Sequence, residues 1–407
     1  MADNPDSPLP TGPALQPEEQ EKMLSAAISQ RATDIHIDPT RNGYEIRFRI
    51  DSLLSTWKQI SKAEGTALVN QIKAFSGIET GATFYPVSHR QRLSISDRPI
   101  EMRVTLVPCI SGPKIAIRII DRDTIRKTIH QLGLSSSSLS GLQEWITTLN
   151  GMFLVTGPTA SGKTTTLYAI LNEIVEESRH VVTLEDPVEY EIDGVNQIQI
   201  DEHHKLNFAD GIKAALRLDP DCLIVGEIRD SGPAIQTMNA SIQGHVVMAT
   251  MHSRDAVSAV TRLRNFQGEN HQIAAALGLV ANQRLVRKLC HDCRKEVKLS
   301  KQEETYFKRF HLRPPSRAFG PGGCESCRMT GYYDRTGLFE IWRMDEEAYD
   351  MILRNTDEAT IREKSIHSGR TSIHEHARDL IEAGVTSFEE VIRLGLDLPW
   401  SDYNALG

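Results

Sequence analysis

The chain has 407 residues with 40% hydrophobic and 25% charged content, which is ordinary for a globular protein of two or three domains. Its net charge of −8 gives no overall attraction to nucleic acid or anionic lipid, so contacts of that kind must be local. No apolar run reaches the roughly 18 residues of a membrane span, and the proline-rich start lacks the apolar core of a signal peptide. We therefore expect a cytoplasmic protein, whose clustered cysteines bind metal rather than form disulfides.

The first part of the chain predicts a tail, a helix and a strand-rich domain. Residues 1–17 contain five prolines and little apolar material, which predicts a flexible tail. Apolar residues at helical spacing predict a helix over 18–30. Alternation of apolar and polar residues then predicts half-buried strands over 44–51, 101–107 and 114–120.

Arginines lie on the polar faces of these predicted strands, among them Arg103 and Arg118. By composition alone, a solvated sheet face is the more ordinary interpretation. The alternative is a basic surface directed at an anion. The polar segment that follows includes four consecutive serines and predicts an interdomain linker, 124–140, that leads into a helix.

Residues 157–164 read Gly-Pro-Thr-Ala-Ser-Gly-Lys-Thr, which matches the pattern of a phosphate-binding loop. An apolar stretch at 152–156 predicts a strand before the loop, and a helix is expected after it. The glycines let backbone N–H groups close around phosphate oxygens, and the helix N-terminus adds a positive dipole. Lys163 is expected to reach the β- and γ-phosphates, and the Thr164 hydroxyl to ligate Mg²⁺. The predicted nucleotide contacts are Gly157, Pro158, Thr159, Ala160, Ser161, Gly162, Lys163, Thr164, Thr165 and Asp186.

Three further apolar stretches, 180–184, 222–226 and 245–251, end in polar residues. Strands that are apolar throughout are typical of a parallel sheet covered on both faces, and ligands bind beyond the carboxyl ends of such strands. The residues that follow these strands should therefore gather around the γ-phosphate: Glu185, Asp186, Glu227 and His252.

Phosphoryl transfer suggests a role for each of these residues. Glu227 is our choice for polarising the attacking water, and Glu185 or Asp186 for supporting Mg²⁺ through its water shell. His252 is placed to sense the γ-phosphate, although a histidine after an apolar strand is more often structural.

Four cysteines form two C-x-x-C pairs that are separated by 30 residues: Cys290, Cys293, Cys324 and Cys327. Four thiolates would complete a closed tetrahedral Zn²⁺ site of structural character; free or redox-active thiols are the alternative. The basic residues within 284–298 lack interleaved aromatics, which favours a solvated face or a subunit contact over nucleic-acid binding. The last predicted helix opens with a capping box at Ser387 and Glu390.

In this order the motifs resemble the assembly ATPases of bacterial type II secretion and type IV pilus systems, members of the secretion ATPase superfamily. The tetracysteine region, 283–332, is typical of the assembly branch, and 32–39, 47–51 and 103–105 resemble the PAS-like domain of the family. The nucleotide motifs match as the Walker A at 157–169, the Asp box at 183–190, the Walker B at 216–230 and the His box at 244–256.

The resemblance implies an α/β fold with a PAS-like domain followed by a RecA-like P-loop ATPase domain. It implies a homohexameric ring that binds ATP, Mg²⁺ and Zn²⁺ and works with inner-membrane platform and cytoplasmic-ring proteins, peripheral to the inner membrane and without a specific nucleic acid. Arg103 and Arg118 would reach the γ-phosphate from the first domain. The implied boundaries are 18–123 for the first domain and 141–407 for the second, with a zinc subdomain at about 284–335 and C-terminal helices at 343–396.

Two departures from the family keep alternatives open. Residues 86–90 retain only the proline and arginine of the family's usual turn, and only a short tail precedes Glu18 where relatives generally carry a docking domain. The leading hypothesis is an ATP-hydrolysing motor for assembly of a secretion pseudopilus or a pilus. The alternatives are a nucleotide-dependent scaffold or regulatory subunit with little turnover and, disfavoured by the net charge of −8, a nucleic-acid translocase.

Overall fold

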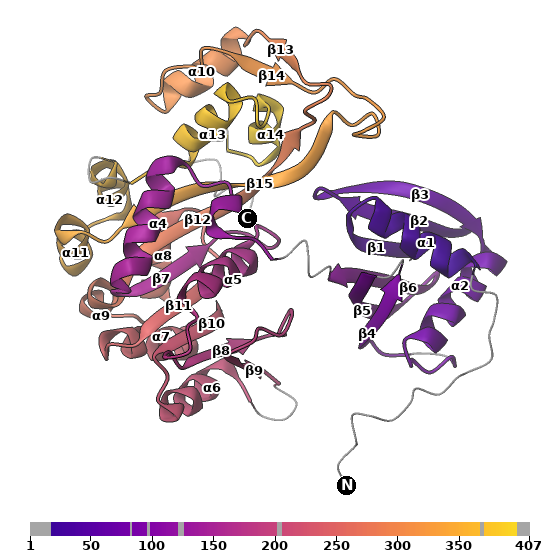
Figure 1. Ribbon diagram of the computed structural model, residues 1–407, viewed down its shortest axis with the longest axis horizontal. Helices are drawn as coiled ribbons and strands as arrows, with labels where there is room; N and C mark the ends of the chain where they lie inside the picture. Colours follow the sequence, from indigo (N-terminus) through magenta and orange to yellow (C-terminus); the bar gives the residue numbers. More distant parts are fainter. Residues whose placement is uncertain are drawn as a thin grey trace. The chain divides into compact units, whose positions relative to one another are not determined.

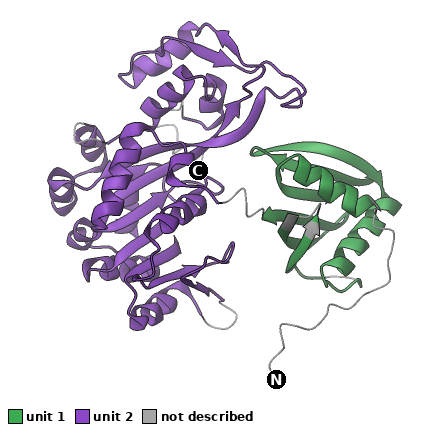
Figure 2. Ribbon diagram, in the orientation of Figure 1, with its two compact units in different colours: residues 1–125 green, residues 126–407 purple. Residues whose placement is uncertain are grey.

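The computed structural model describes residues 18–81, 84–95, 98–120, 126–201, 206–366 and 370–396, so the predicted tail, 1–17, lies outside the described residues. The chain divides into two compact units, residues 1–125 and 126–407, and each has its own hydrophobic core (Figure 2). Among the described residues, the helices are all too short or too polar to traverse a lipid bilayer.

Unit 1 is a six-stranded antiparallel sheet with two helices packed on one of its faces (Figure 1). The strand order is β3-β2-β1-β6-β5-β4. Its helices are α1 (Glu18–Ser29) and α2 (Lys62–Phe75). Its strands are β1 (Ala32–Pro39), β2 (Gly43–Ile50), β3 (Leu53–Ser61), β4 (Val87–Ile95), β5 (Arg98–Cys109) and β6 (Gly112–Ile120).

The alternation predicted for three of these strands is confirmed. Phe48 in β2, Val104 in β5 and Ile117 in β6 are buried under the helices, with exposures of 0–2%. Arg103 and Arg118 are exposed on the opposite face, as partners in the β5–β6 register. A sheet with one apolar and one polar face explains the period of two in the sequence.

Unit 2 is built on a seven-stranded sheet with the order β15-β12-β7-β11-β10-β8-β9. All neighbours pair in parallel except the edge strand β15, which is antiparallel to β12. The prediction of a buried parallel sheet is confirmed. Its strands are β7 (Met152–Thr156), β8 (Val181–Glu185), β9 (Val195–Gln199), β10 (Cys222–Ile228), β11 (Val246–Met251), β12 (Leu277–Leu289) and β15 (Tyr332–Arg343).

Helices cover both faces of this sheet, and a separate hydrophobic cluster fills each interface. One cluster includes Trp145 of α4 (Ser136–Thr148) and Leu167 of α5 (Lys163–Ile174). The other joins the sheet to a second layer, which consists of α6 (Phe208–Ala215), α7 (Ser231–Ile242), α8 (Ala256–Asn265), α9 (Asn270–Ala276), α11 (Glu346–Leu353) and α12 (Glu358–Ser365). Because both faces are covered, polar residues are accommodated mainly where the strands end.

The strands β12 and β15 continue past the sheet as a long antiparallel pair that carries a further lobe (Figure 1). The lobe has its own hydrophobic cluster. Its elements are β13 (Lys295–Val297), α10 (Lys301–Arg309), β14 (Ala318–Gly320), α13 (Ile373–Glu382) and α14 (Phe388–Arg393). Both C-x-x-C pairs lie in this lobe, one after β12 and one before β15.

Two local expectations need correction. The capping box at Ser387 is wrong, because Glu390 is fully buried and accepts hydrogen bonds from Arg287 and Arg393 instead of the α14 backbone. Arg287 is not part of a solvated basic face: its side chain is 14% exposed and its guanidinium lies 3.9 Å from the centroid of the Tyr332 ring. The Glu390 carboxylate is therefore paired with these two arginines inside the lobe and is not available to cap α14.

The segment predicted as a linker, 124–140, is divided by the structure. Residues 124 and 125 lie outside the described residues. The rest belongs to unit 2, in which Ile129–Gln131 form a short 3-10 helix and Ser135 caps α4 by accepting from the Ser138 amide at 3.2 Å. The predicted start of a helix in the serine run is therefore confirmed.

Candidate functional site

The phosphate loop joins β7 to α5 at the carboxyl edge of the unit 2 sheet. Gly157 has φ 146° and Gly162 has φ 90°, which side-chain-bearing residues rarely adopt. A Cβ added at Gly157 would lie 2.3 Å from the Gln283 carbonyl oxygen, and one at Gly162 would lie 2.8 Å from Gln283 Nε2. Both glycines are therefore required by the close approach of the loop to β12, and the predicted strand, loop and helix are confirmed.

Lys163 begins α5 and folds back over the loop. Its Nζ donates to the carbonyl oxygens of Gly157 and Pro158, both at 3.0 Å. Burial lowers the pKa of Lys163 to about 8; the Glu227 carboxylate opposes this shift and the Arg284 guanidinium adds to it. Thr164, the next residue, is exposed at the first turn of the helix. The loop therefore presents a cation and a hydroxyl together at a helix N-terminus.

Glu227 and His252 meet beside this loop. His252 Nε2 lies 2.9 Å from Glu227 Oε1, and its Nδ1 lies 2.9 Å from the Gly157 carbonyl oxygen. Arg229 bridges two carboxylates, with Nε 2.8 Å from Glu227 Oε2 and Nη1 3.2 Å from Asp186 Oδ2. Residues that follow three different strands thus form one connected polar cluster at the phosphate loop, as the parallel-sheet argument predicts.

Glu185 and Asp186 are adjacent in sequence but lie in different environments. Glu185 is 5% exposed and accepts hydrogen bonds from Tyr168, from Thr183 Oγ1 at 2.6 Å and from Gln197 Nε2 at 3.1 Å. Burial and the neighbouring Glu185 charge both raise the pKa of Tyr168, so this phenol remains a donor. The Asp186 side chain is 41% exposed and faces Arg229. Asp186 is therefore the more accessible of the two carboxylates.

Sequence reasoning missed the contribution of β12 to this site. Gln283 Oε1 accepts a 2.7 Å hydrogen bond from Thr166 Oγ1 of α5. Asn282 Nδ2 donates to Thr156 Oγ1 at 2.9 Å, and Arg284 Nη2 donates to the Arg254 carbonyl at 2.7 Å. The signal was present, because two amide residues interrupt a long stretch of strand-forming residues and buried amides require partners.

Arg103 and Arg118 belong to unit 1 and are described within it. Arg118 Nε lies 3.2 Å from Asp34 Oδ1, and Arg103 Nε donates to Ser88 Oγ at 3.2 Å. Their face of the sheet is therefore a mixed charged surface, on which arginines have local partners.

The four cysteines form a compact cluster in the lobe of unit 2. Their sulfur atoms all lie within 4.8 Å of one another, and the Cys290–Cys324, Cys293–Cys327 and Cys324–Cys327 pairs are each 3.7 Å apart. Burial opposes ionisation of Cys327, but the amides of Cys324 and Gly331 donate to its Sγ at 3.2 Å and the net effect lowers its pKa to about 6. A cluster with this spacing can hold one metal ion.

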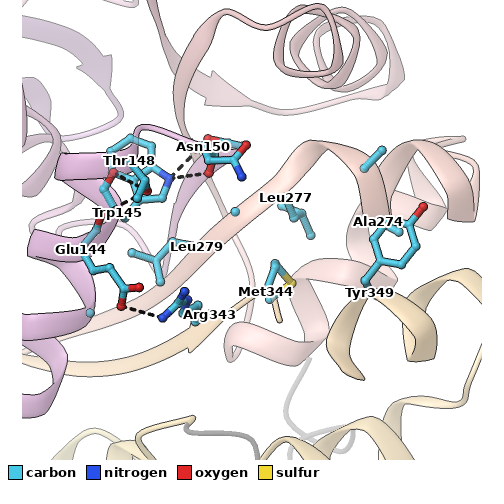
Figure 3. A pocket seen from close by; sticks show the side chains of 14 residues that line it. Glu144, Trp145, Thr148, Asn150, Ala274, Leu277, Leu279, Arg343, Met344 and Tyr349 are labelled. Atoms are coloured by element: carbon cyan, nitrogen blue, oxygen red, sulfur yellow. Dashed lines mark hydrogen bonds and ion pairs between the residues drawn. The ribbon is translucent and has the colours of Figure 1, made fainter. Parts of the chain in front are cut away.

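A cavity of about 320 Å³ lies at the opposite, amino-terminal edge of the same sheet (Figure 3). It is bounded by α4, the turn before β7, the start of β12 and the end of β15. Trp145 Nε1 donates to the Asn150 carbonyl at 3.1 Å, and Arg343 Nη1 lies 2.6 Å from Glu144 Oε2. Arg343 and Glu144 thus form an ion pair with each other. The polar cluster at the phosphate loop lies at the carboxyl edge, and we assign the candidate site to that edge.

The fold resembles the solved structures of an ATPase and of a pilus retraction motor. The ATPase DotB of Legionella pneumophila superimposes with a TM-score of 0.68 at 22% identity, over 97% of this chain and 98% of DotB. The pilus retraction motor PilT with bound ADP superimposes with a TM-score of 0.61 at 20% identity, over 93% of this chain and 96% of PilT. At these identities the likeness establishes a shared α/β fold.

Relatives found by sequence share a higher identity with this chain. The type II secretion system protein E of Aeromonas hydrophila is 38% identical over 372 residues, which are 91% of this chain and 74% of the relative. The type II secretion system ATPase E of Vibrio cholerae is 37% identical over the same shares. The model of the family described as type II/IV secretion system protein matches residues 14–393. The chain therefore belongs to the type II/IV secretion system protein family.

Proposed function

We propose that this protein is an ATP hydrolase that drives assembly of a type II secretion pseudopilus or a type IV pilus. One observation carries the proposal: Lys163 and His252 both contact the Gly157 carbonyl, and His252 also contacts Glu227, so groups from three strand ends face one phosphate loop. Family membership and relatives named as secretion ATPases support it.

Each residue of the cluster has a role in this proposal. Lys163 exchanges its two carbonyl contacts for the β- and γ-phosphates, and Thr164 offers its hydroxyl to Mg²⁺. Glu227 orients the attacking water, and His252 reports on the γ-phosphate because it links Glu227 to the loop. Asp186 supports Mg²⁺ through water, since its carboxylate is exposed, while Glu185 holds the base of the site through its buried hydrogen bonds.

The proposal extends to the architecture and the assembly. Unit 1 corresponds to a PAS-like domain, 18–123, and unit 2 to a RecA-like domain, 141–407, with a metal subdomain at about 284–335 and C-terminal helices at 343–396. Arg103 and Arg118 reach the γ-phosphate when the two domains close on nucleotide. The chain acts as a homohexamer, which associates peripherally with the cytoplasmic side of the inner membrane through the platform and ring proteins of its machine. The relatives named as type II secretion proteins support this setting.

Zinc is the metal that we propose for the four cysteines. Four thiolates are soft ligands, and a tetrahedron with Zn–S bonds of about 2.3 Å has edges of about 3.8 Å, close to the observed 3.7 Å sulfur separations. All four coordination positions are then filled by the protein, so the ion stabilises the fold of the lobe and leaves no position for substrate.

Replacement of Cys324 by serine tests this assignment. The wild-type chain should carry one Zn²⁺ by elemental analysis, while Cys324→Ser should lose it and should unfold at a lower temperature. Cys109→Ser, which changes an exposed cysteine outside the cluster, is the matched control and should keep the ion. Full retention of zinc and stability by Cys324→Ser would contradict a four-thiolate site.

A second candidate function is a nucleotide-dependent scaffold or regulatory subunit with little turnover. The observation that favours it is the engagement of both Glu227 oxygens, one by His252 and one by Arg229, which withholds this carboxylate from a water molecule. Steady-state hydrolysis of Mg²⁺–ATP by the purified full chain, alone and with its membrane partners, separates the two. Multiple turnovers support the motor; tight ATP binding without turnover in both conditions supports the scaffold.

A further inference from the structure

The four residues 252–255 connect β11 to α8 and carry His252 at one end and Asp255 at the other. Both ring nitrogens of His252 are engaged, by the Gly157 carbonyl and by Glu227. Asp255 is 2% exposed and caps α8 by accepting from the Ser258 amide at 2.6 Å. Because only two residues separate Asp255 from His252, we expect a displacement of Asp255 to change the position of His252. We refer to residues 252–255 as the sensor loop.

Strand β12 holds the middle of the sensor loop. Asn282 Nδ2 donates to the Ser253 carbonyl at 3.2 Å, and Arg284 Nη2 donates to the Arg254 carbonyl at 2.7 Å. This strand also lines the phosphate loop through Gln283. The middle of the sensor loop thus contacts the same strand that lines the nucleotide site.

Helix α12 holds the far end of the sensor loop through buried charges. Arg362 Nη2 donates to Asp255 Oδ2 at 2.9 Å and to Glu358 Oε1 at 2.5 Å, and the Arg362 and Asp255 side chains are only 16% and 3% exposed. The other Glu358 oxygen accepts from Thr261 Oγ1 of α8 at 2.7 Å. Arg254 Nη2 also lies 3.5 Å from Glu358 Oε1. Helix α12 therefore contacts both the sensor loop and the helix that follows it.

Arg362 is itself held in place. Arg370 Nη2 donates to the Arg362 carbonyl at 3.0 Å, and Arg370 Nη1 lies 2.6 Å from the buried Glu340 carboxylate of β15. The Ala256 amide, directly after the sensor loop, also hydrogen-bonds to Glu340. Two buried ion pairs thus flank the start of α8 and join it to the C-terminal part of the chain.

Burial of an ion pair is weak support for stability alone, because desolvation can cancel the attraction between the charges. The Arg287–Glu390 pair offers a comparison within the same unit, since its side chains are 14% and 0% exposed. It joins β12 to α14 in the lobe, and its partner groups are not part of the sensor loop. The Arg287–Glu390 and Arg362–Asp255 pairs are similarly buried, but only the second contacts the sensor loop.

We propose that Arg362 is a positioning residue for nucleotide hydrolysis. It fixes Asp255 and with it the sensor loop, so that His252 stays between the phosphate loop and Glu227. A movement of α12 relative to α8 would then change the position of His252, which makes α12 a lever between the C-terminal helices and the nucleotide site. The inference rests on the proposed function, because the role of His252 belongs to that proposal.

Kinetics of the full chain with Arg362→Gln, with Arg362→Lys and with Arg287→Gln as the matched control test the role. Arg362→Gln should lower kcat for ATP about tenfold or more and change KM less than about threefold, because a small misplacement far from the chemistry affects the transition state. Arg362→Lys keeps the charge but not the planar fork, so it should recover only part of the rate. In a His252→Ala background, Arg362→Gln should cause no further loss, because it acts through His252.

Hydrogen exchange over 251–257 supplies a readout that does not need turnover. Exchange there should quicken about tenfold in Arg362→Gln and stay unchanged in Arg287→Gln, even if both variants lose similar thermal stability. If the wild type does not hydrolyse ATP, the proposed function fails while the exchange result still decides the role of Arg362. Unchanged exchange in a folded Arg362→Gln overturns the inference; if that variant does not fold, the same result for Arg362→Lys overturns it. Additive losses with His252→Ala overturn it as well.

Discussion

The two sheets of this protein place polar residues in opposite ways. In unit 1 every second residue of a strand faces outward, so charged side chains cover one face, and Arg118 lies opposite Arg103 in the register. In unit 2 the central strands are buried on both faces, and polar groups gather where those strands end, as Glu227 and His252 do. Polar residues on an open face have many possible purposes, whereas polar residues at converging strand ends point to one site.

The polar residues of the two units therefore differ in how closely they define a site. On the unit 1 face, arginines pair with local carboxylates, as Arg118 does with Asp34 at 3.2 Å, and the Arg118 side chain is 60% exposed. Exposed pairs of this kind contribute only about 0–1 kcal/mol each, so they are free to exchange partners. At the unit 2 edge, His252 contacts both the phosphate loop and Glu227, and each group is placed by a different strand. Experiments on each unit test this difference.

The largest effect expected in unit 1 comes from its exposed arginines. Under the proposal that Arg118 balances the charge of the transferred phosphate, Arg118→Gln should lower ATP turnover about 100-fold at saturating Mg²⁺–ATP. Arg103→Gln should behave in the same way. The measurement is kcat for the assembled full chain.

Arg47→Gln, on the same face but at β2, is the matched control and should stay within about twofold of the wild type, because its ion pair with Asp38 lies within unit 1. Equal losses in all three variants would mean that the effect is not specific to Arg103 and Arg118, and no loss in any of them would leave the face of unit 1 a solvated surface without a role in closure.

A pH effect of about tenfold is expected at Lys163. Its pKa of about 8 lies below the usual value for lysine, so the side chain is charged below pH 8 and loses its proton as the pH rises through that value. Phosphate binding requires the charged form, so ATP affinity should be constant near pH 7 and about tenfold weaker by pH 9. Titration with a fluorescent ATP analogue measures this.

Lys163→Arg is the control for the pH profile, because arginine stays protonated throughout this range. Its pH profile of ATP affinity should be flat, whatever its absolute affinity. A flat wild-type profile up to pH 9 would show that the pKa of Lys163 is not lowered or that Lys163 does not contact phosphate.

The smallest expected effect concerns the buried base of the site. Tyr168→Phe removes one donor from the Glu185 carboxylate and should cost about 2 kcal/mol, or a fall of about 5 °C in the Tm of a unit of this size. Mg²⁺-dependent ATP affinity should not change. Tyr349→Phe, at a tyrosine that is 41% exposed, should leave both quantities unchanged. Loss of Mg²⁺-dependent binding in a stable Tyr168→Phe would instead place Glu185 in the magnesium site.

Sequence reasoning predicted the phosphate loop, the buried parallel strands and the meeting of Glu227 with His252. It could do so because the loop pattern is local, and because parallel strands bring their carboxyl ends to one edge. The clustering of the four cysteines could also be predicted, because the C-x-x-C spacing of each pair suits chelation of one metal ion.

The sequence marks β12 by its two amide residues, but it does not show which groups they contact, nor that the neighbouring Glu185 and Asp186 lie in different environments. Gln283 contacts a helix that lies more than 100 residues earlier in the chain, and its hydrogen bond to Thr166 exists only in the folded protein. Glu185 and Asp186 differ through the side chains that surround each one, which no local pattern encodes. The capping box at Ser387 failed for a related reason, because the distant Arg287 competes for Glu390.

The most direct test of the central claim is turnover by Glu227→Gln. The substitution keeps the size of the side chain and removes the charge that orients water, so ATP binding should stay within about threefold of the wild type while kcat falls about 100-fold or more. A Glu227→Gln chain that binds and hydrolyses Mg²⁺–ATP at the wild-type rate would contradict the assignment of the carboxyl edge as a hydrolysis site.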